Sequence, residues 1–313
     1  MSEAAPVPDE GYVERDLTPD ELQLAFHEVE CHTYDERFGI SYDEHTAASA
    51  AREANRLLDG AVFDTVVDVG CGTGFLGLGL ASAGQVRDLH MVDLSPGMLS
   101  RARVNAEQLG VRATFLEATA AALPFDTNSV DAVVTRGVLH HLHDVPAALA
   151  EWRRIVRPGG VVIALSEPTP QADSIGGLVA RAALGSLKAA RVAARAVGRP
   201  LSAHPAEEAQ TNHFWDLVSM AANLHTFRAQ DLHDLGVAAG FTHVEVRGSG
   251  LVSISWAAAY YCMVGELPAL AASERAKRNS GRIFEALRRL DDAVVERVLP
   301  AGGLMTVQAI FRG

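Results

Sequence analysis

The sequence predicts an α/β fold in which a mostly parallel sheet is covered by helices on both faces. Short runs that are apolar on both faces, such as 65–69 and 130–135, alternate with stretches of helical periodicity. Glycines close the first of these runs, as a turn from strand to helix requires. With 313 residues, of which 48% are hydrophobic, the chain can bury a large core. This composition excludes a wholly disordered protein.

The predicted elements follow one another in a regular order. A helix should begin at Pro19, because Thr18 is a good N-cap and acidic residues fill the first turn. A second helix should span 44–58, and a later one 228–239. Strands are predicted at 65–69, 89–92, 113–116, 130–135, 160–166, 243–246 and 304–311.

Two stretches interrupt this alternation and are predicted to be helical insertions. They cover residues 168–224 and, within the last part of the chain, about 256–298. The expected organisation is a disordered acidic arm (1–17), a helical cap (18–60), a core (61–167 and 225–313) and an insertion that governs specificity (168–224).

Charge is distributed unevenly along the chain. The formal net charge is −12, and residues 1–44 carry 13 acidic and 2 basic side chains. A non-specific nucleic-acid binder needs a basic surface, so this balance excludes that class. The first insertion is basic, with Arg181, Lys188, Arg191 and Arg195. These side chains could engage a phosphate-bearing substrate or an anionic membrane surface, or they could form the solvated face of an alanine-rich helix.

No segment predicts export or membrane insertion. The first residues have neither the basic start nor the apolar run of a signal peptide. The longest uncharged stretch, 248–265, carries three Gly and three Ser, which favours a buried strand followed by a buried helix. Three cysteines without a C-x-x-C pair exclude a disulfide scaffold and a zinc ribbon. We therefore expect a cytoplasmic protein.

The most specific motif is a glycine-rich turn directly after the first predicted strand. Asp68 precedes Gly70, Gly72 and Gly74, and such a turn lets the backbone approach a ligand while it points a helix N-terminus at it. Asp93 ends the second strand, where an acid would bind ribose hydroxyls. Counted from its second glycine, the turn also satisfies the dinucleotide fingerprint G-x-G-x-x-G. This turn alone therefore fits more than one adenosine cofactor.

Motifs further along the chain separate these alternatives. Residues 90–99, HMVDLSPGML, resemble a segment of class I S-adenosylmethionine-dependent methyltransferases, and 68–74 resembles motif I of that family. Further matches to family motifs are ALPF at 122–125, DAV at 131–133, LHHL at 139–142, LAEWRRIVRPGG at 149–160 and the segment 226–240. On this resemblance the chain is identified as a member of the small-molecule, ubiquinone-biosynthesis-like (type 11) group, rather than as a nicotinamide dehydrogenase.

The resemblance implies a Rossmann-like seven-stranded sheet of order 3-2-1-4-5-7-6, with the last strand antiparallel, and S-adenosyl-L-methionine as cofactor. The glycines would lie beneath the methionine part of the cofactor, Asp93 would bond both ribose hydroxyls, and Leu94 and Met98 would flank the adenine. Thr119 stands where related enzymes commonly carry an Asp that bonds the adenine amino group, so that contact should be weaker. The implied cofactor-binding residues are Asp68, Gly70, Gly72, Gly74, Asp93, Leu94, Met98, Thr119, Ala120, Arg136 and Tyr34.

Candidate catalytic groups follow the fourth and fifth predicted strands. His140 and His141 follow the fourth strand and Glu167 the fifth, so neighbouring strand ends would bring them together. A carboxylate beside a histidine fixes its tautomer and stabilises the imidazolium that forms when it removes a proton. The alternative is that the two histidines are structural. A metal site could be formed by the neighbouring residues His140, His141, His143 and Asp144, but side chains on one short loop diverge, so we expect no catalytic metal there.

The leading functional prediction is S-adenosylmethionine-dependent methylation of a small molecule. We expect an O-methyltransferase of specialised metabolism that uses the His/Glu pair as its base. The alternatives are C-methylation of a quinone-like, prenyl or phosphorylated acceptor, and a catalytically silent homologue that only binds the cofactor. The expected partner is a small molecule, anionic or lipid-soluble, with no nucleic acid and no integral membrane segment. The oligomeric state, a homodimer included, is left open.

Overall fold

The computed structural model describes residues 18–38, 40–196, 224–266, 273–299 and 303–313. The acidic arm expected over 1–17 lies outside the described residues. The same holds for residues 197–223 of the first insertion.

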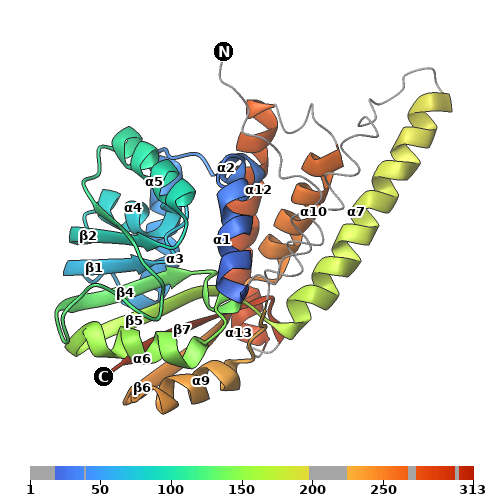
Figure 1. The fold of residues 1–313 in the computed structure, drawn as a ribbon. Helices are drawn as coiled ribbons and strands as arrows, with labels where there is room; N and C mark the ends of the chain where they lie inside the picture. The colour runs from blue at the N-terminus through green and yellow to red at the C-terminus, as the bar shows by residue number, and fades with distance from the viewer. Residues whose placement is uncertain (1–17, 39, 197–223, 267–272, 300–302) are drawn as a thin grey trace.

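A seven-stranded sheet organises the molecule, with strand order β3-β2-β1-β4-β5-β7-β6 (Figure 1). Five neighbouring strands pair in parallel: β3 (Thr114–Glu117), β2 (Val86–Asp93), β1 (Phe63–Val69), β4 (Val130–Arg136) and β5 (Val156–Pro168). The last strand, β7 (Thr306–Arg312), lies between β5 and β6 (His243–Ser249) and is antiparallel to both. The predicted strand order and the antiparallel last strand are confirmed.

Helices cover both faces of the sheet, as the apolar runs predict. On one face, α3 (Glu44–Leu58), α4 (Phe75–Ser82) and α5 (Pro96–Leu109) pack on side chains such as Val66 and Met91. On the other face, α6 (Val145–Ile155) and α9 (Ala229–Ala238) pack on the alternate residues, such as Val67 and Val133. Each face therefore carries its own hydrophobic core, because successive strand residues point to opposite sides.

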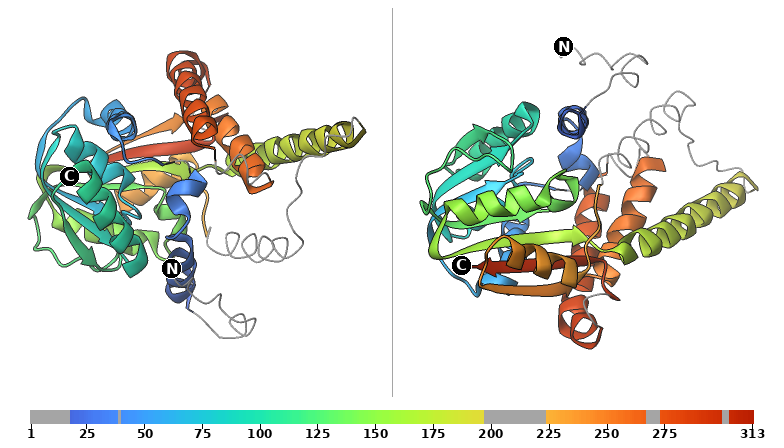
Figure 2. Two further views of the ribbon diagram at one scale, coloured as in Figure 1. Left: turned by 90° about the horizontal axis from the view of Figure 1, so that it is seen from above. Right: turned by 60° about the horizontal axis from the view of Figure 1, so that its bottom comes forward.

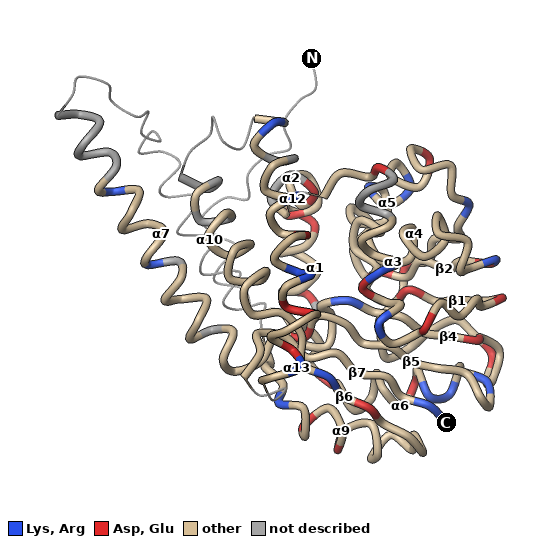
Figure 3. The backbone as a smooth tube through the Cα atoms, turned by 180° about the vertical axis from the view of Figure 1, so that it is seen from behind, with Lys and Arg blue, Asp and Glu red and all other residues tan. Residues whose placement is uncertain are grey.

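The remaining helices lie at the carboxyl edge of the parallel strands. Of the helical cap expected over 18–60, α1 (Pro19–Glu30), which begins after the predicted N-cap Thr18, and α2 (Tyr34–Phe38) lie at this edge and form the cap, whereas α3 packs on the sheet. Helix α7 (Pro170–Ala196) starts where β5 ends and extends away from the core (Figures 1 and 2). Basic positions follow one another along α7 (Figure 3), and the described side chains among them, Arg181 and Lys188, are exposed. No helix within the described ranges is both long and apolar enough to cross a bilayer.

The insertion between β6 and β7 differs in detail from the sequence prediction. It begins at Val252 rather than near residue 256 and comprises α10 (Val252–Glu266), α12 (Glu274–Leu290), a short π-helix (Asp291–Val295) and α13 (Glu296–Val298). Helix α10 starts early because the Asp291 carboxylate accepts hydrogen bonds from the backbone N–H groups of Val252 and Ser253. This N-cap comes from a residue far along the chain, so local sequence could not reveal it.

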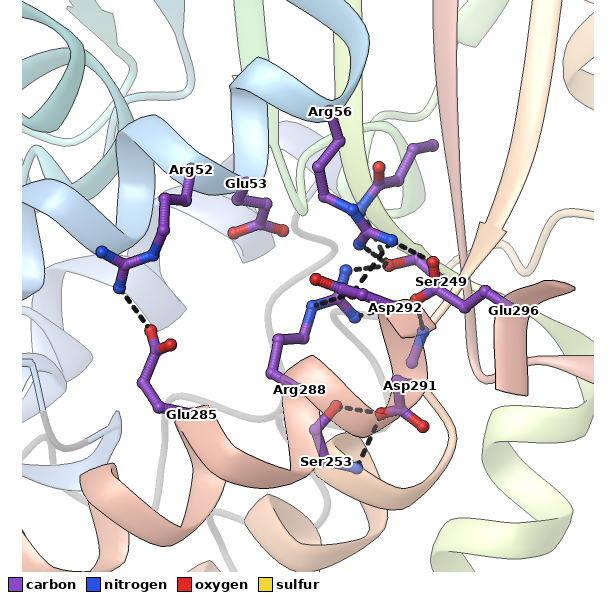
Figure 4. Close-up of polar contacts among 12 residues, drawn as sticks. Arg52, Glu53, Arg56, Ser249, Ser253, Glu285, Arg288, Asp291, Asp292 and Glu296 are labelled. Carbon is purple, nitrogen blue, oxygen red and sulfur yellow. Dashed lines mark hydrogen bonds and ion pairs between the residues drawn. The ribbon is translucent and has the colours of Figure 1, made fainter. Parts of the chain in front are cut away.

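Charged side chains fix this insertion to α3 (Figure 4). Arg56 of α3 pairs with Glu296 and with Asp292, whose Oδ1 lies 3.0 Å from Arg56 Nη2. Arg288 of α12 donates to the Ser249 hydroxyl at 2.6 Å and lies 3.3 Å from Glu296. Acidic and basic groups from four elements thus meet at the end of β6.

We expect Arg56→Met to destabilise the fold measurably. Without Arg56, the carboxylates of Glu296 and Asp292 share Arg288 as their remaining cationic partner. The loss of charged hydrogen bonds of this kind lowers the free energy of unfolding by about 2 kcal/mol. Urea unfolding measures the loss. The control is Arg87→Met, which removes an exposed pair with Asp64 and should change stability by about 0.5 kcal/mol or less. Equal stability of the two variants would contradict an anchoring role for Arg56.

Candidate active site

A cavity of about 470 Å³ opens at the carboxyl edge of the sheet, between the sheet and the cap. The glycine turn after β1, the turns after β2 and β4, and helices α1 and α2 form its walls. It brings together most of the residues singled out from the sequence: Tyr34, Asp68, Gly70, Gly72, Asp93, Leu94, Met98, Thr119, Ala120, Arg136, His140 and His141. Gly74 and Glu167 lie behind this wall and do not line the cavity.

The glycine turn has a backbone that side chains would disturb. Gly70 has φ +64°, and a Cβ added there would lie 2.6 Å from a methyl carbon of Val138. Gly74, at the N-cap of α4, has φ +102°. Gly72 has φ +52°, and an added Cβ would meet no atom within 4 Å, so this glycine borders open space. Gly70 thus allows close packing of two strand ends, and Gly72 leaves its backbone exposed to the cavity.

Two carboxylates accept hydrogen bonds from backbone N–H groups in and beside this turn. Asp68 Oδ2 accepts a hydrogen bond from the Gly77 N–H at 2.8 Å, and burial raises the pKa of Asp68 to about 7. Asp93 accepts from the Gly72 N–H at 2.8 Å and from the Ser95 N–H at 2.9 Å. Burial also raises the pKa of Asp93, although these two N–H donors oppose the shift. Two acids therefore border a cavity that suits a cationic ligand.

The cap is fastened directly over the glycine turn. Glu28 of α1 accepts hydrogen bonds from the Ser95 hydroxyl at 2.6 Å and from the Gly97 N–H at 2.8 Å, at the N-terminus of α5. Tyr42 follows α2, and its hydroxyl lies 2.8 Å from Oγ1 of Thr73, a residue of the glycine turn. The cap therefore closes the cavity by contacts with the same loops that form its floor.

The cap also supplies cavity residues that we did not infer from the sequence. Gln23, His27 and Glu30 line the cavity from α1. Their spacing of four and three residues places them on one face of the helix. This spacing could have predicted them as cavity residues if the position of α1 over the cavity had been known. Phe75 and Ser166 are two further lining residues without a sequence prediction.

Glu167 organises the loop that carries the histidines. Its Oε1 accepts from the N–H groups of Val138 (2.9 Å) and Leu139 (3.0 Å). Its Oε2 accepts from the His140 N–H at 3.2 Å and lies 2.9 Å from His140 Nδ1. Because the carboxylate accepts, Nδ1 carries the proton, and Nε2 of neutral His140 holds the lone pair. Glu167 is fully buried, so it acts on His140 from behind the cavity wall.

His141 lies in a row with two other imidazoles. Its ring centroid is 3.9 Å from that of His140 and 5.2 Å from that of His27. The contact with His27 is edge-on, so the row joins the β4 loop to cap helix α1. Within the part of the chain that the structure describes, no group of three His, Cys, Asp or Glu side chains is arranged to hold a metal ion.

Comparison with known proteins agrees with this architecture. Residues 66–160 match the family model described as a methyltransferase domain. The chain is similar to demethylmenaquinone methyltransferase of Thermus thermophilus, with 36% identity over 111 residues that cover 36% of this chain and 50% of the relative. It is also similar to malonyl-[acyl-carrier protein] O-methyltransferase of Halorhodospira halophila, with 37% identity over 98 residues, 31% of this chain and 33% of the relative. The chain thus spans about half the length, or less, of these curated relatives.

A solved structure shows that the likeness in fold extends beyond the matched region. Haemonchus contortus phosphoethanolamine N-methyltransferase 2, in complex with phosphomonomethylethanolamine and S-adenosylhomocysteine, superimposes with a TM-score of 0.55 and 16% identity, covering 94% of this chain and 59% of that one. At this identity the likeness concerns the fold alone.

The strand order, the glycine turn and the match to a methyltransferase domain all agree with the class I methyltransferases. The resemblance to S-adenosylmethionine-dependent methyltransferases that the sequence motifs predicted is confirmed over residues 66–160.

Proposed function

We propose that the protein binds S-adenosyl-L-methionine in this cavity and transfers its methyl group to an oxygen atom of a small-molecule acceptor. The single observation that supports the oxygen acceptor best is the hydrogen bond between buried Glu167 and His140, which orients the imidazole of a cavity-lining residue. The activity of the whole protein is a proposal, because the curated relatives match only about a third of the chain.

The residues present fit this cofactor. A volume of about 470 Å³ is in the range of small-molecule sites. Asp93 stands at the end of β2 with its carboxylate at the cavity wall, where it would accept hydrogen bonds from the ribose hydroxyls. Gly72 borders open space with its backbone, and Thr119 and Met98 would contact the adenine. The acidic groups match the positive charge of a sulfonium ligand.

When bound, the cofactor supplies an activated methyl carbon. The protein residues then have two tasks, which are to align the acceptor and to take its proton. His140 would accept the hydroxyl proton at Nε2, and Glu167 would stabilise the resulting imidazolium at Nδ1. The cap residues would exclude water from the acceptor, because α1 and α2 cover the cavity.

The test is a comparison of His140→Ala with His143→Ala. Incubation with isotope-labelled S-adenosylmethionine and metabolite extract, followed by mass analysis, first identifies a product. We expect kcat of His140→Ala to fall about a hundredfold or more, with cofactor affinity unchanged. The control residue His143 is exposed on the same loop and lies outside the cavity lining. Near-normal turnover of His140→Ala would refute the proposed base.

C-methylation of a quinone-like acceptor is a second candidate, favoured by the similarity to demethylmenaquinone methyltransferase. An activated ring carbon also loses a proton, so the same imidazole could serve it. The NMR shift of the transferred methyl group in the purified product distinguishes a methoxy group from a methyl group on carbon. Cofactor binding without transfer to any component of the extract would instead favour a silent homologue.

A further inference from the structure

Arg136 carries the cationic group of the cavity wall. It ends β4, and among the cavity-lining residues of the described chain it is the only Arg or Lys. Its guanidinium carbon lies 4.8 Å from the centre of the Phe75 ring, directly after the glycine turn. Its Nε donates to Glu53 Oε2 at 3.0 Å. Arg136 is therefore held on one side by an aromatic ring and on another by a carboxylate.

Glu53 is fixed in its own position by a strained residue. The Ser166 hydroxyl donates to Glu53 Oε1 at 2.6 Å, so both oxygens of Glu53 are bonded. Burial would raise the pKa of Glu53, but the Arg136 guanidinium and the Ser166 hydroxyl hold that pKa below its usual range. Glu53 is therefore ionised at neutral pH. Ser166 has φ +58°, a left-handed conformation that L-residues adopt only where surrounding structure enforces it.

Ser166 and Glu167 are consecutive residues, and this backbone conformation directs their side chains to different parts of the cavity wall. The pairing of β5 with β7 shifts register between Ala164 and Glu167, around Ser166. Ser166 points its hydroxyl to Glu53 on α3, whereas Glu167 bonds the loop that carries His140. One irregular strand end thus supports both Arg136 and the proposed base.

The position of Glu53 on α3 is also fixed from outside the core. The Ser49 hydroxyl and Arg52 Nη2 lie 2.8 and 2.7 Å from Glu285 of α12, and Arg56 pairs with Glu296. In Figure 4, Glu53 lies between Arg52 and Arg56 on the same helix, and no hydrogen bond or ion pair is drawn between Glu53 and the labelled residues of α12. Its two partners, Arg136 and Ser166, both line the cavity.

We propose that Glu53 is a positioning residue that, with Ser166, aims Arg136 at the carboxylate of the cofactor's methionyl group. The inference rests on the proposed function. If Asp93 on β2 holds the ribose, the sheet order places the opposite end of the cofactor over the glycine turn and the end of β4, which is where Arg136 stands. A guanidinium held in place loses less conformational entropy when it binds a carboxylate.

The experiment compares two ligands that differ in the group recognised. S-adenosylhomocysteine carries the amino-acid group, and 5′-methylthioadenosine lacks it. We expect Glu53→Gln to weaken S-adenosylhomocysteine about tenfold in calorimetric titration, the loss of one charged hydrogen-bonding partner, and to leave methylthioadenosine unchanged. In an Arg136→Ala background, Glu53→Gln should have little further effect on S-adenosylhomocysteine affinity, because the guanidinium that Glu53 positions is absent. The control is Glu285→Gln, which removes a carboxylate of α12 that accepts hydrogen bonds from Ser49 and Arg52 of α3 and should change neither affinity.

The outcomes are distinguishable. Equal weakening of both ligands by Glu53→Gln, or no weakening of S-adenosylhomocysteine, would overturn the positioning role and leave the proposed function standing. Failure of the wild-type protein to bind either ligand would overturn the proposed function and this inference with it. Should Glu53→Gln fail to fold, Ser166→Ala removes one hydroxyl and is expected to weaken S-adenosylhomocysteine selectively by about threefold; no selective effect would overturn the role.

Discussion

Glu167→Gln is expected to reduce both the free energy of unfolding and the turnover, although it exchanges a single oxygen for an amide nitrogen. Both carboxylate oxygens accept hydrogen bonds, from the N–H groups of Val138, Leu139 and His140 and from His140 Nδ1. A glutamine keeps one accepting oxygen and turns an NH₂ donor toward two of these donors. Because Glu167 is fully buried, water cannot replace the lost acceptor, and we expect a loss of about 3 kcal/mol.

The effect on turnover follows from the tautomer of His140. Without an acceptor at Nδ1, the imidazole is no longer held with its Nε2 lone pair toward the cavity, and the imidazolium loses its counter-charge. We expect kcat to fall about a hundredfold, within the usual contribution of general base catalysis. Urea unfolding and steady-state kinetics measure the two losses separately.

The matched control for this change is Glu117→Gln. Glu117 also ends a parallel strand, β3, but its side chain is exposed, so both stability and kcat should stay close to wild type. A Glu167→Gln protein that loses stability and retains its kcat would show that the carboxylate serves only to hold the loop. The proposed base would then have to be abandoned.

The sequence was sufficient for the sheet and the glycine turn because both depend on neighbouring residues. The apolar runs and the residues between them predicted every strand of the sheet. The strand order was implied by the resemblance of the motifs to the family. The pairing of Asp93 with the turn could be anticipated in the same way, since strand ends of a parallel sheet meet at one edge. Most residues predicted for the cofactor line one cavity, although their roles there stay predictions.

Residues whose role depends on the packing of distant helices could not be predicted. His27 reaches the cavity only because Glu28 fixes α1 to the start of α5. In the sequence, Glu53 is one of several charged residues on a predicted helix. Its contact with Arg136 at the end of β4 becomes evident only from the packing of α3. Nor could the sequence decide which of two adjacent histidines faces Glu167, because that depends on the turn between Leu139 and His141.

Asp68→Asn is expected to stabilise the protein without cofactor and to weaken cofactor binding. Burial raises the pKa of Asp68 from 3.8 to about 7, so the folded protein favours the protonated carboxyl more than the unfolded chain does. Its contribution to stability is therefore full below about pH 4 and is lost as the pH rises to 7. Asparagine is neutral at every pH, and its amide oxygen can still accept the Gly77 N–H.

The stability of the variant relative to wild type should thus depend on pH in a defined way. The advantage of Asp68→Asn should be small near pH 4, grow up to about pH 7 and then stay level, at a size on the order of 4 kcal/mol for a shift of this extent. Urea unfolding between pH 4 and 8 measures it. Asp64→Asn on the same strand is the control, because Asp64 is exposed and its pair with Arg87 should contribute about 0.5 kcal/mol or less at any pH.

Cofactor affinity should change in the opposite direction over the same pH range. At pH 8 the wild-type carboxylate faces the cavity as an anion and would attract a sulfonium or ammonium group through a medium of low dielectric constant. We expect Asp68→Asn to bind S-adenosylmethionine about tenfold more weakly at pH 8, and the difference to shrink toward pH 5, where wild-type Asp68 is protonated. Opposite trends in stability and affinity would show that this acid destabilises the empty fold in order to hold a cation. Curves of Asp68→Asn and wild type that run parallel at all pH values would rule that out.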